Sequence, residues 1–185
     1  TINTILKETY GYEQFRNLEI YDDLSKGKEK LCISQGQLIE NVILEAEKAW
    51  KGETQVDNIL LTAPTGSGKS LLFQLPAIYL GKEYNLLTIV VSPLKALIVD
   101  QVESLQELGY TRVAYASSDL SPEQKMEVYR QVREGEIDLF YLSPELLLSY
   151  DIKHFVGERR IGLVVVDEAH TVTTWGKEFR VDYWF

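Results

Sequence analysis

Cysteine and histidine are scarce in this chain of 185 residues, which contains one cysteine, Cys32, and two histidines, His154 and His170. A single cysteine cannot form an internal disulfide, and two histidines with one cysteine are too few for a Cys/His zinc cluster. The sequence therefore excludes a disulfide scaffold and a structural zinc domain. Any metal ion that the protein binds must rest on oxygen ligands.

Long hydrophobic runs and an excess of positive charge are also missing. The apolar runs, such as Ile161–Val166, are far too short to span a membrane, and the N-terminus does not resemble a signal peptide. We therefore expect a cytoplasmic protein without membrane contact. The net charge of −9 argues against tight duplex binding by this domain alone, although a local basic or stacking surface remains compatible with it.

What the sequence does contain is a regular alternation of short apolar strands and helical segments. Strands are expected at 58–63, 87–92, 112–116, 137–142 and 163–167. Helices are expected at 38–50 (apolar stripe Leu38, Val42, Ala46, Ala49 and Trp50), 69–80, 94–108 and 121–134. This alternation is typical of parallel βαβ units, and several strands are apolar on both faces. The pattern predicts an α/β fold, with a mostly parallel sheet and helices on both faces, and an exposed turn at Asp22–Lys30.

A phosphate-binding loop is indicated by the sequence A-P-T-G-S-G-K-S. Such a loop wraps its backbone N–H groups around phosphates, so each of its positions is a candidate nucleotide contact. These positions are Ala63, Pro64, Thr65, Gly66, Ser67, Gly68, Lys69 and Ser70. Lys69 would reach the β- and γ-phosphates, and the Ser70 hydroxyl would ligate Mg²⁺. The loop departs from the strict pattern at Ala63, where glycine is usual.

An acidic tetrad, Asp167-Glu168-Ala169-His170, directly follows the apolar run Ile161–Val166. Asp167 would hold Mg²⁺, and Glu168 would polarise the attacking water. Both motifs are expected at the carboxyl ends of parallel strands, where ligands of α/β sheets bind. Together they predict a P-loop NTPase domain that binds and hydrolyses ATP. The alternative, a glycine-rich turn plus a solvated acidic cluster, requires two coincidences of position.

The order of the motifs resembles that of superfamily 2 helicases, and within them the RecQ type. Between the two ATP motifs come Ser92-Pro93-Leu94-Lys95-Ala96-Leu97, Asp100-Gln101-Val102 and Leu142-Ser143-Pro144-Glu145. Residues 174–183, T-W-G-K-E-F-R-V-D-Y, are similar to the aromatic-rich loop that RecQ-type enzymes carry after D-E-x-H. Residues 10–16, Y-G-Y-E-Q-F-R, resemble the family's N-terminal nucleotide-contacting motif. The resemblance covers nearly the whole chain.

The resemblance implies a RecA-like motor domain of an ATP-dependent DNA helicase, with 3′-to-5′ movement along single-stranded or partly duplex DNA. It assigns catalytic roles to Lys69, Asp167 and Glu168, and it gives His170 the role of linking the ATP site to later motifs. Two alternatives remain at this point. One is an RNA helicase or duplex translocase of superfamily 2, and the other is a non-catalytic nucleic-acid-binding module.

Nucleic-acid contacts fall into two groups under this resemblance. The first group follows strands and opens helices, where it could contact phosphates without reading sequence: Ser92, Pro93, Lys95, Gln101, Ser143, Pro144 and Glu145. Ordinary helix capping by the two serines is the alternative. The second group is the aromatic loop, with stacking faces and positive charge suited to a single strand: Trp175, Lys177, Phe179 and Arg180. Lys177 and Val181 depart from the histidine and proline that the family often has.

The adenine site is expected in the N-terminal segment. Tyr12 or Phe15 could stack on the base, and Arg16 could reach a phosphate. An amide can both donate to and accept from adenine, whereas a carboxylate can only accept, so Gln37 is a better candidate for base recognition than Glu19. The alternative for Gln37 is a surface residue in the first turn of a helix.

Two regions are expected, an N-terminal nucleotide-contacting segment with its leading helix (1–57) and a RecA-like ATP-binding domain (58–185). In two-domain helicases, a second RecA-like domain closes over the nucleotide and supplies an arginine finger. Because the motifs of that second domain are not in this sequence, we expect the 185 residues alone to bind ATP weakly, to hydrolyse it poorly and to unwind nothing.

Overall fold

The computed structural model describes residues 1–21, 30–62 and 68–168 of the chain. The chain divides into two compact units, Thr1–Leu80 and Gly81–Phe185, and each unit is described by itself. Among the described residues, no helix is both long enough and apolar enough to cross a membrane. The division after residue 57 that the sequence suggests stays a prediction.

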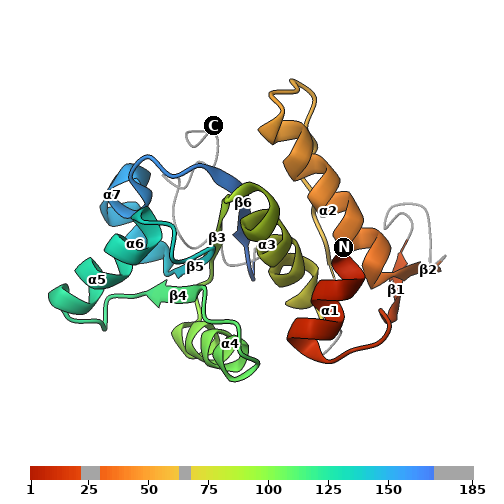
Figure 1. The fold of residues 1–185 in the computed structure, drawn as a ribbon, viewed down its shortest axis with the longest axis horizontal. Helices are drawn as coiled ribbons and strands as arrows, with labels where there is room; N and C mark the ends of the chain where they lie inside the picture. The colour runs from red at the N-terminus through yellow and green to blue at the C-terminus, as the bar shows by residue number, and fades with distance from the viewer. Residues whose placement is uncertain (22–29, 63–67, 169–185) are drawn as a thin grey trace. The chain divides into compact units, whose positions relative to one another are not determined.

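The first unit combines helices with a small antiparallel hairpin (Figure 1). Its elements are α1 (Ile2–Tyr10), β1 (Asn17–Tyr21), β2 (Lys30–Ser34), α2 (Gln35–Trp50) and the larger part of α3 (Leu71–Tyr84). Helix α1 ends at Gly11, whose φ of 69° is left-handed and suits a glycine C-terminal cap. In the hairpin, Asn17 pairs with Ser34, so the chain enters and leaves it at neighbouring positions.

Helix α2 begins with a capping box that involves Ser34 and Gln37. The Ser34 hydroxyl accepts a hydrogen bond from Gly36 N–H at 3.1 Å, and Ser34 N–H donates to Gln37 Oε1 at 3.2 Å. The buried apolar face of this helix carries Ile39, Ile43 and Ala46. The predicted stripe is therefore wrong by about one residue, because Leu38 and Val42 are half-buried and Ala49 and Trp50 are exposed.

The predicted strand at 58–63 is wrong over the residues that the structure describes there. Residues 58–62 form no ladder with any described strand, and the side chains of Ile59 and Leu60 are 48% and 82% exposed. An apolar run becomes a strand only where a neighbour accepts its hydrogen bonds. The strands β1 and β2, which the sequence did not predict, lie on either side of the turn expected at Asp22–Lys30. Residues 22–29 of that turn lie outside the described residues, and Lys30 belongs to β2.

The second unit contains a four-stranded parallel sheet. Its strands are β3 (Leu87–Val91), β4 (Val113–Ala116), β5 (Leu139–Leu142) and β6 (Ile161–Val166). Their order is β4-β5-β3-β6, and every neighbouring pair is parallel. All residues of β3 and β5 are buried, which explains why these central strands are apolar on both faces. These four strands confirm the corresponding sequence predictions to within two residues.

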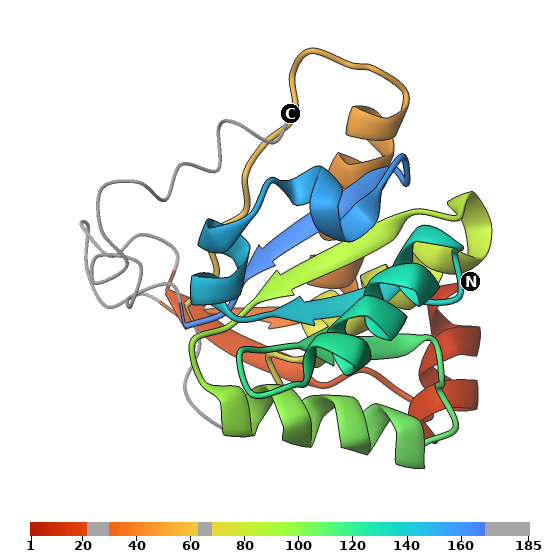
Figure 2. The same cartoon turned by 90° about the vertical axis from the view of Figure 1, so that its left-hand side faces the viewer.

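Helices cover both faces of this sheet. They are α4 (Lys95–Glu107), α5 (Pro122–Arg133), α6 (Pro144–Ser149) and α7 (Ile152–Val156). The crossover β3-α4-β4 runs in one direction along the sheet, whereas β4-α5-β5 and β5-α6-α7-β6 run in the other. Because such crossovers are right-handed, α4 lies on one face and α5 to α7 lie on the opposite face. Figure 2 shows α5 and α7 in front of the strands. The predicted fold class is thus confirmed.

The apolar core of this unit packs the inner residues of β3 and β5 against α5, α6 and α7. Its largest side chains include Phe140 of β5, Tyr129 of α5 and Phe155 of α7, and each is at most 2% exposed. The predicted start of α5 is confirmed, since Gln124 N–H donates to the Ser121 hydroxyl at 3.2 Å and Ser121 N–H donates to Gln124 Oε1 at 2.9 Å. Gly109 follows α4 with a φ of 86°, as expected for a helix stop.

An ionic cluster lies at the amino ends of the parallel strands. It consists of Arg112, Asp138 and Arg159, and we call it the amino-end cluster. The Asp138 carboxylate is 1% exposed and accepts hydrogen bonds from Arg112 Nε at 2.6 Å and from Arg159 Nη2 at 2.6 Å. The bond with Asp138 raises the pKa of the Arg112 guanidinium. Gly81 of α3 packs on this carboxylate, since a Cβ there would lie 2.5 Å from Asp138 Cγ.

Candidate nucleotide and nucleic-acid site

The phosphate loop is described from Gly68 onward, and Ala63 to Ser67 lie outside the described residues. Gly68 has a φ of 80°, a conformation that glycine adopts without strain. Its carbonyl accepts from Leu71 N–H at 3.2 Å, and the Ser70 carbonyl accepts from Gln74 N–H at 2.9 Å. The loop therefore passes directly into α3. The positive dipole end of α3 therefore lies at the residues that follow the loop, which is the end of a helix that favours bound phosphate.

The N-terminal segment lies against the same helix start. Tyr10 hydroxyl donates to Gln74 Oε1 of α3 at 3.2 Å, and the Tyr10 and Tyr12 rings are nearly parallel with centroids 6.4 Å apart. The Tyr12 side chain is 51% exposed, which leaves its ring accessible for stacking. Arg16 is also exposed. The structure thus places Tyr12 and α3 in one neighbourhood, and their contact with a nucleotide stays a prediction.

The amide of Gln37 has a local role in this structure, because its Oε1 accepts from Ser34 N–H in the capping box. Gln37 is exposed, which agrees with its alternative role as a surface residue in the first turn of a helix. Its Nε2 has no part in that bond, so the capping box leaves the donor side of the amide available. Reading of adenine by Gln37 stays a prediction.

Gln35 is a residue that the sequence analysis missed. It is 2% exposed, its Oε1 accepts from Arg16 N–H at 3.1 Å, and its Nε2 donates to Gly68 O at 3.4 Å. A polar residue beside a helix start is usually read as surface, and only the hairpin pairing of Asn17 with Ser34 brings Gln35 against Arg16. The spacing along the sequence contains no signal for that contact.

The acidic pair closes β6 at the carboxyl end of the sheet. Asp167 N–H donates to the carbonyl of Val91, the last residue of β3, at 2.9 Å. Asp167 Oδ1 accepts from Glu168 N–H at 3.0 Å, and Glu168 has a φ of 52°. A non-glycine residue pays about 1 kcal/mol or more for this left-handed conformation, and such strain gathers at functional sites. The expected position at a strand end is confirmed.

The donor chemistry at these positions fits Mg²⁺. Ser70 offers a hydroxyl oxygen and Asp167 a carboxylate oxygen, which are ligands that Mg²⁺ prefers. Within the described ranges, no group of three or more His, Cys, Asp and Glu residues is arranged to hold a metal ion.

Ser92 and Ser143 lie at equivalent positions, just after β3 and β5. Both are buried, at 2% and 0% exposure, and neither hydroxyl has a hydrogen-bond partner among the described residues. The capping alternative is wrong for Ser92, because the N-cap of α4 is Leu94. Ser143 does occupy the N-cap position of α6, with Pro144 after it, but its hydroxyl makes no cap hydrogen bond. Their backbone N–H groups are also occupied, by Leu142 O and Ala116 O. Phosphate contact by either serine stays a prediction and would require the helix start to open.

Gln101 faces the sheet rather than the surface. It is 9% exposed, and its Oε1 accepts from the buried Tyr141 hydroxyl at 2.9 Å. This bond ties α4 to β5. Pro144 is likewise buried, whereas Pro93 is half-buried and Glu145 is exposed. Of the helix-opening residues expected to meet nucleic acid, Lys95 and Glu145 are thus the most accessible.

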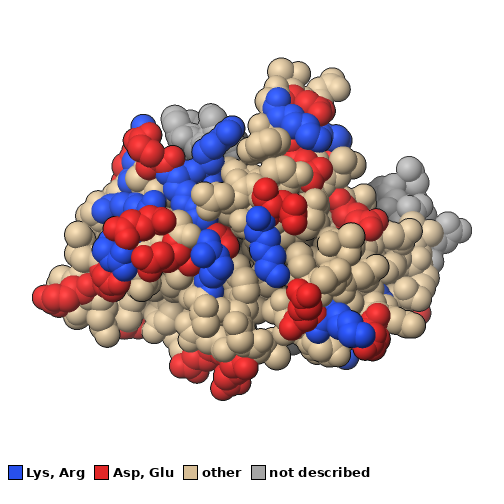
Figure 3. Space-filling model, in the orientation of Figure 1, with Lys and Arg blue, Asp and Glu red and all other residues tan. Residues whose placement is uncertain are grey.

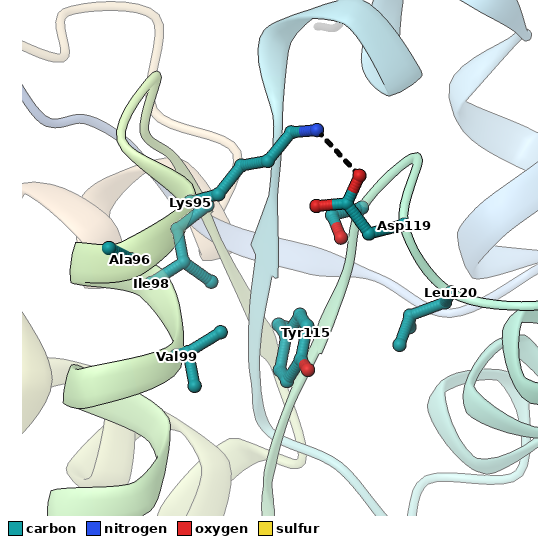
Figure 4. A pocket seen from close by; sticks show the side chains of 8 residues that line it. Lys95, Ala96, Ile98, Val99, Tyr115, Asp119 and Leu120 are labelled. Carbon is teal, nitrogen blue, oxygen red and sulfur yellow. Dashed lines mark hydrogen bonds and ion pairs between the residues drawn. The ribbon is translucent and has the colours of Figure 1, made fainter.

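Lys95 sits at the mouth of a pocket of about 240 Å³ between α4 and the loop that follows β4. Its Nζ donates to Ser118 Oγ at 2.7 Å and to Asp119 Oδ1 at 2.9 Å. Figure 4 shows Lys95 and Asp119 pointing toward each other, with Tyr115 and Leu120 along the wall below. The hydrogen bond from Lys95 lowers the pKa of Asp119. No spacing in the sequence connects Lys95 with Asp119, so this pairing was missed.

Basic and acidic side chains are mixed over α5, on the left of Figure 3. Arg130 donates to Glu127 at 2.8 Å and to Glu136 at 3.0 Å, and it also pairs with Glu134. Among the residues that the structure describes, the Arg130 guanidinium thus has three acidic partners. Any attraction of this part of the surface for nucleic acid must therefore be local, as the net charge of −9 suggests.

The remaining predicted residues lie outside the described part of the chain. They are His170 and the aromatic-loop residues Trp175, Lys177, Phe179 and Arg180. Their predicted roles stay predictions.

Comparison with known proteins finds one matching family and several similar proteins. The model of the DEAD/DEAH box helicase family matches residues 38–184. ATP-dependent DNA helicase RecQ of Bacillus subtilis is 32% identical over 180 residues, covering 97% of this chain and 25% of the relative. RecQ of Synechocystis sp. is 33% identical over 185 residues, covering 99% of this chain and 32% of the relative. ATP-dependent DNA helicase Q-like 5 of Arabidopsis thaliana is 40% identical over 183 residues, covering 98% of this chain and 16% of the relative.

These matches confirm the resemblance that the motifs suggested. The chain spans about a third or less of the length of these relatives.

Proposed function

Because the chain belongs to the DEAD/DEAH box helicase family, we propose that it is the ATP-binding motor domain of an ATP-dependent DNA helicase of the RecQ type. In the full-length protein it would couple ATP hydrolysis to movement along single-stranded DNA and to duplex unwinding. The observation that carries this proposal is the placement of Asp167 and Glu168 at the carboxyl end of β6, beside the end of β3.

The residues of the ATP motifs would divide the chemistry among them. Lys69 follows Gly68 at the entrance to α3, where its ammonium would neutralise charge on the β- and γ-phosphates. Ser70 and Asp167 would hold Mg²⁺, which supplies charge neutralisation at the phosphates. Glu168 would accept a hydrogen bond from the attacking water and orient it toward the γ-phosphorus. The backbone N–H of Glu168 donates to Asp167 Oδ1 and so orients the Asp167 carboxylate.

The proposed nucleic-acid substrate is single-stranded or partly duplex DNA. Lys95 and Glu145 offer accessible side chains at helix starts after two parallel strands. Trp175 and Phe179 would stack on bases and signal strand binding to Glu168 through His170. We also propose that a second RecA-like domain of the full-length protein completes the site with an arginine finger, and that the protein is cytoplasmic.

ATPase measurements on the full-length protein test this function. Rates would be compared with single-stranded DNA, single-stranded RNA and duplex DNA. Lys69→Ala should abolish hydrolysis, whereas Lys82→Ala, near the far end of the helix α3 that follows Lys69, should not. Trp175→Ala should lose stimulation by DNA and keep basal hydrolysis, with Trp50→Ala as its matched control. Stimulation by RNA alone would contradict the DNA assignment, and rapid DNA-stimulated hydrolysis by the 185 residues alone would contradict the need for a second domain.

A further inference from the structure

Gln35 is an uncharged polar side chain buried in the first unit. It is the first residue of α2 and is 2% exposed. A buried amide costs free energy unless its donors and acceptors are paired. Its position between the N-terminal segment and the phosphate loop therefore calls for a specific pairing.

The pairing that it makes joins two parts of the candidate nucleotide site. Oε1 accepts from Arg16 N–H at 3.1 Å, while the backbone N–H of Gln35 donates to Arg16 O at 2.9 Å. Nε2 donates to Gly68 O at 3.4 Å. Only one orientation of the amide satisfies both contacts, because a backbone N–H requires an acceptor and a carbonyl requires a donor.

The contact with Gly68 is also a close packing contact. A Cβ at Gly68 would lie 2.7 Å from Gln35 Nε2, so the amide fills the space that any larger residue would need. Gly68 directly precedes Lys69, and its carbonyl also accepts the first helical hydrogen bond of α3. Gly68 therefore connects the Gln35 amide to the backbone that leads to Lys69.

We propose that Gln35 is a positioning residue that couples the base-contacting segment around Tyr12 and Arg16 to the phosphate loop. Binding of adenine against that segment holds Arg16, Arg16 holds the amide, and the amide holds Gly68. The base thereby raises the affinity of the loop for the triphosphate. This inference rests on the proposed function, because it takes ATP as the nucleotide.

The test measures dissociation constants of the full-length protein for three Mg²⁺ complexes, those of ATP, GTP and inorganic triphosphate, by titration calorimetry. Gln35→Met keeps the volume and removes both hydrogen bonds. Gln35→Glu keeps the acceptor for Arg16 N–H and removes the donor to Gly68, so it serves if the first variant does not fold. Gln55→Glu, an exposed residue of the same unit, is the matched control.

We expect the preference for ATP over triphosphate, and over GTP, to fall roughly tenfold in both Gln35 variants. Binding of triphosphate alone should change little, and Gln55→Glu should behave as wild type. Equal weakening of all three ligands would show a purely structural role and overturn the inference, as would an unchanged preference. Failure of the wild-type protein to bind ATP would instead overturn the proposed function.

Discussion

Two ion-pair clusters lie at opposite ends of the same parallel sheet. At the carboxyl ends of β3 and β4, Lys95 and Asp119 have side chains that are 41% and 68% exposed. In the amino-end cluster, Asp138 and Arg159 are 1% and 5% exposed. The clusters use similar chemistry, carboxylates with lysine or arginine, and they differ mainly in their access to water.

That difference separates a fixed contact from an exchangeable one. Breaking a buried pair leaves a charge without compensation, whereas an exposed pair loses little when water replaces one partner. Through Asp138, Arg112 and Arg159 therefore fix the amino ends of β4 and β5 and the segment that leads into β6. Lys95 can leave Asp119 for a phosphate at small cost, at the end of the sheet where ligands of α/β folds bind.

The largest expected effect is at Asp138. Asp138→Asn keeps the size of the side chain but leaves the Arg159 guanidinium buried without a counter-charge. We expect the free energy of unfolding to fall by about 3–5 kcal/mol, measured by urea denaturation. A loss below about 1 kcal/mol would show that the amino-end cluster stabilises the fold no more than a surface ion pair does.

The two arginines of that cluster should rank by their burial. Arg159→Met should cost about 2–3 kcal/mol, because it uncovers the Asp138 carboxylate and removes a donor to the Val132 carbonyl. Arg112 is 44% exposed, so water can replace part of its contact and Arg112→Met should cost less. Parallel urea melts of the two variants check the order, and a reversed order would contradict burial as the deciding factor.

Gly81 extends the same argument to packing. In a helix, replacing glycine by alanine ordinarily gains about 1 kcal/mol. Here the added Cβ would lie 2.5 Å from Asp138 Cγ, and two arginines prevent that carboxylate from moving away. We expect Gly81→Ala to destabilise by about 1–3 kcal/mol in thermal or urea unfolding. A stabilised Gly81→Ala variant would show that the Asp138 carboxylate can move away from the added Cβ.

At the exposed end, Asp119→Asn should leave unfolding nearly unchanged and should free Lys95. We expect the affinity of the full-length protein for single-stranded DNA to rise by roughly threefold at low salt, with a steeper salt dependence. Fluorescence anisotropy over a salt series measures both. Glu134→Gln, which removes an exposed acid of the Arg130 network, is the control. Equal gains in both variants would indicate a general charge effect.

The smallest effect concerns pH. The hydrogen bond from Lys95 lowers the pKa of Asp119 in the folded state. A carboxyl with a lowered pKa contributes stability that is present above its unfolded pKa of about 3.9 and is lost as pH falls through the folded value. The small difference in the free energy of unfolding between wild type and Asp119→Asn should therefore be present at pH 7 and vanish in stronger acid. NMR titration of the Asp119 carboxyl in wild type and Lys95→Met checks the cause.

The sequence was sufficient where local chemistry decides the structure. Apolar runs such as Leu139–Leu142 become buried strands, and Ser121 with Gln124 caps α5 as their spacing predicts. The positions of Asp167 and Glu168 followed from the strand that precedes them. The sequence failed where a partner distant in the chain decides, as at residues 58–62, which have the pattern of a strand but no ladder in the described structure.

Burial of polar side chains was the other failure within the site. Ser92 and Gln101 look like surface contacts in sequence, yet the sheet and α4 enclose them. Gln35 looks like an ordinary helix start, yet it lies between Arg16 and Gly68. Each outcome depends on contacts between elements that no spacing rule contains.

The pairing of Asn17 with Ser34 has a practical consequence for protein engineering. Because Arg16 and Gln35 are hydrogen-bonded to each other, the segment between them begins and ends at one point of the fold. A foreign peptide or a reporter domain whose own termini are close together could be inserted within the segment between Arg16 and Gln35. The backbone before and after that segment would keep its conformation.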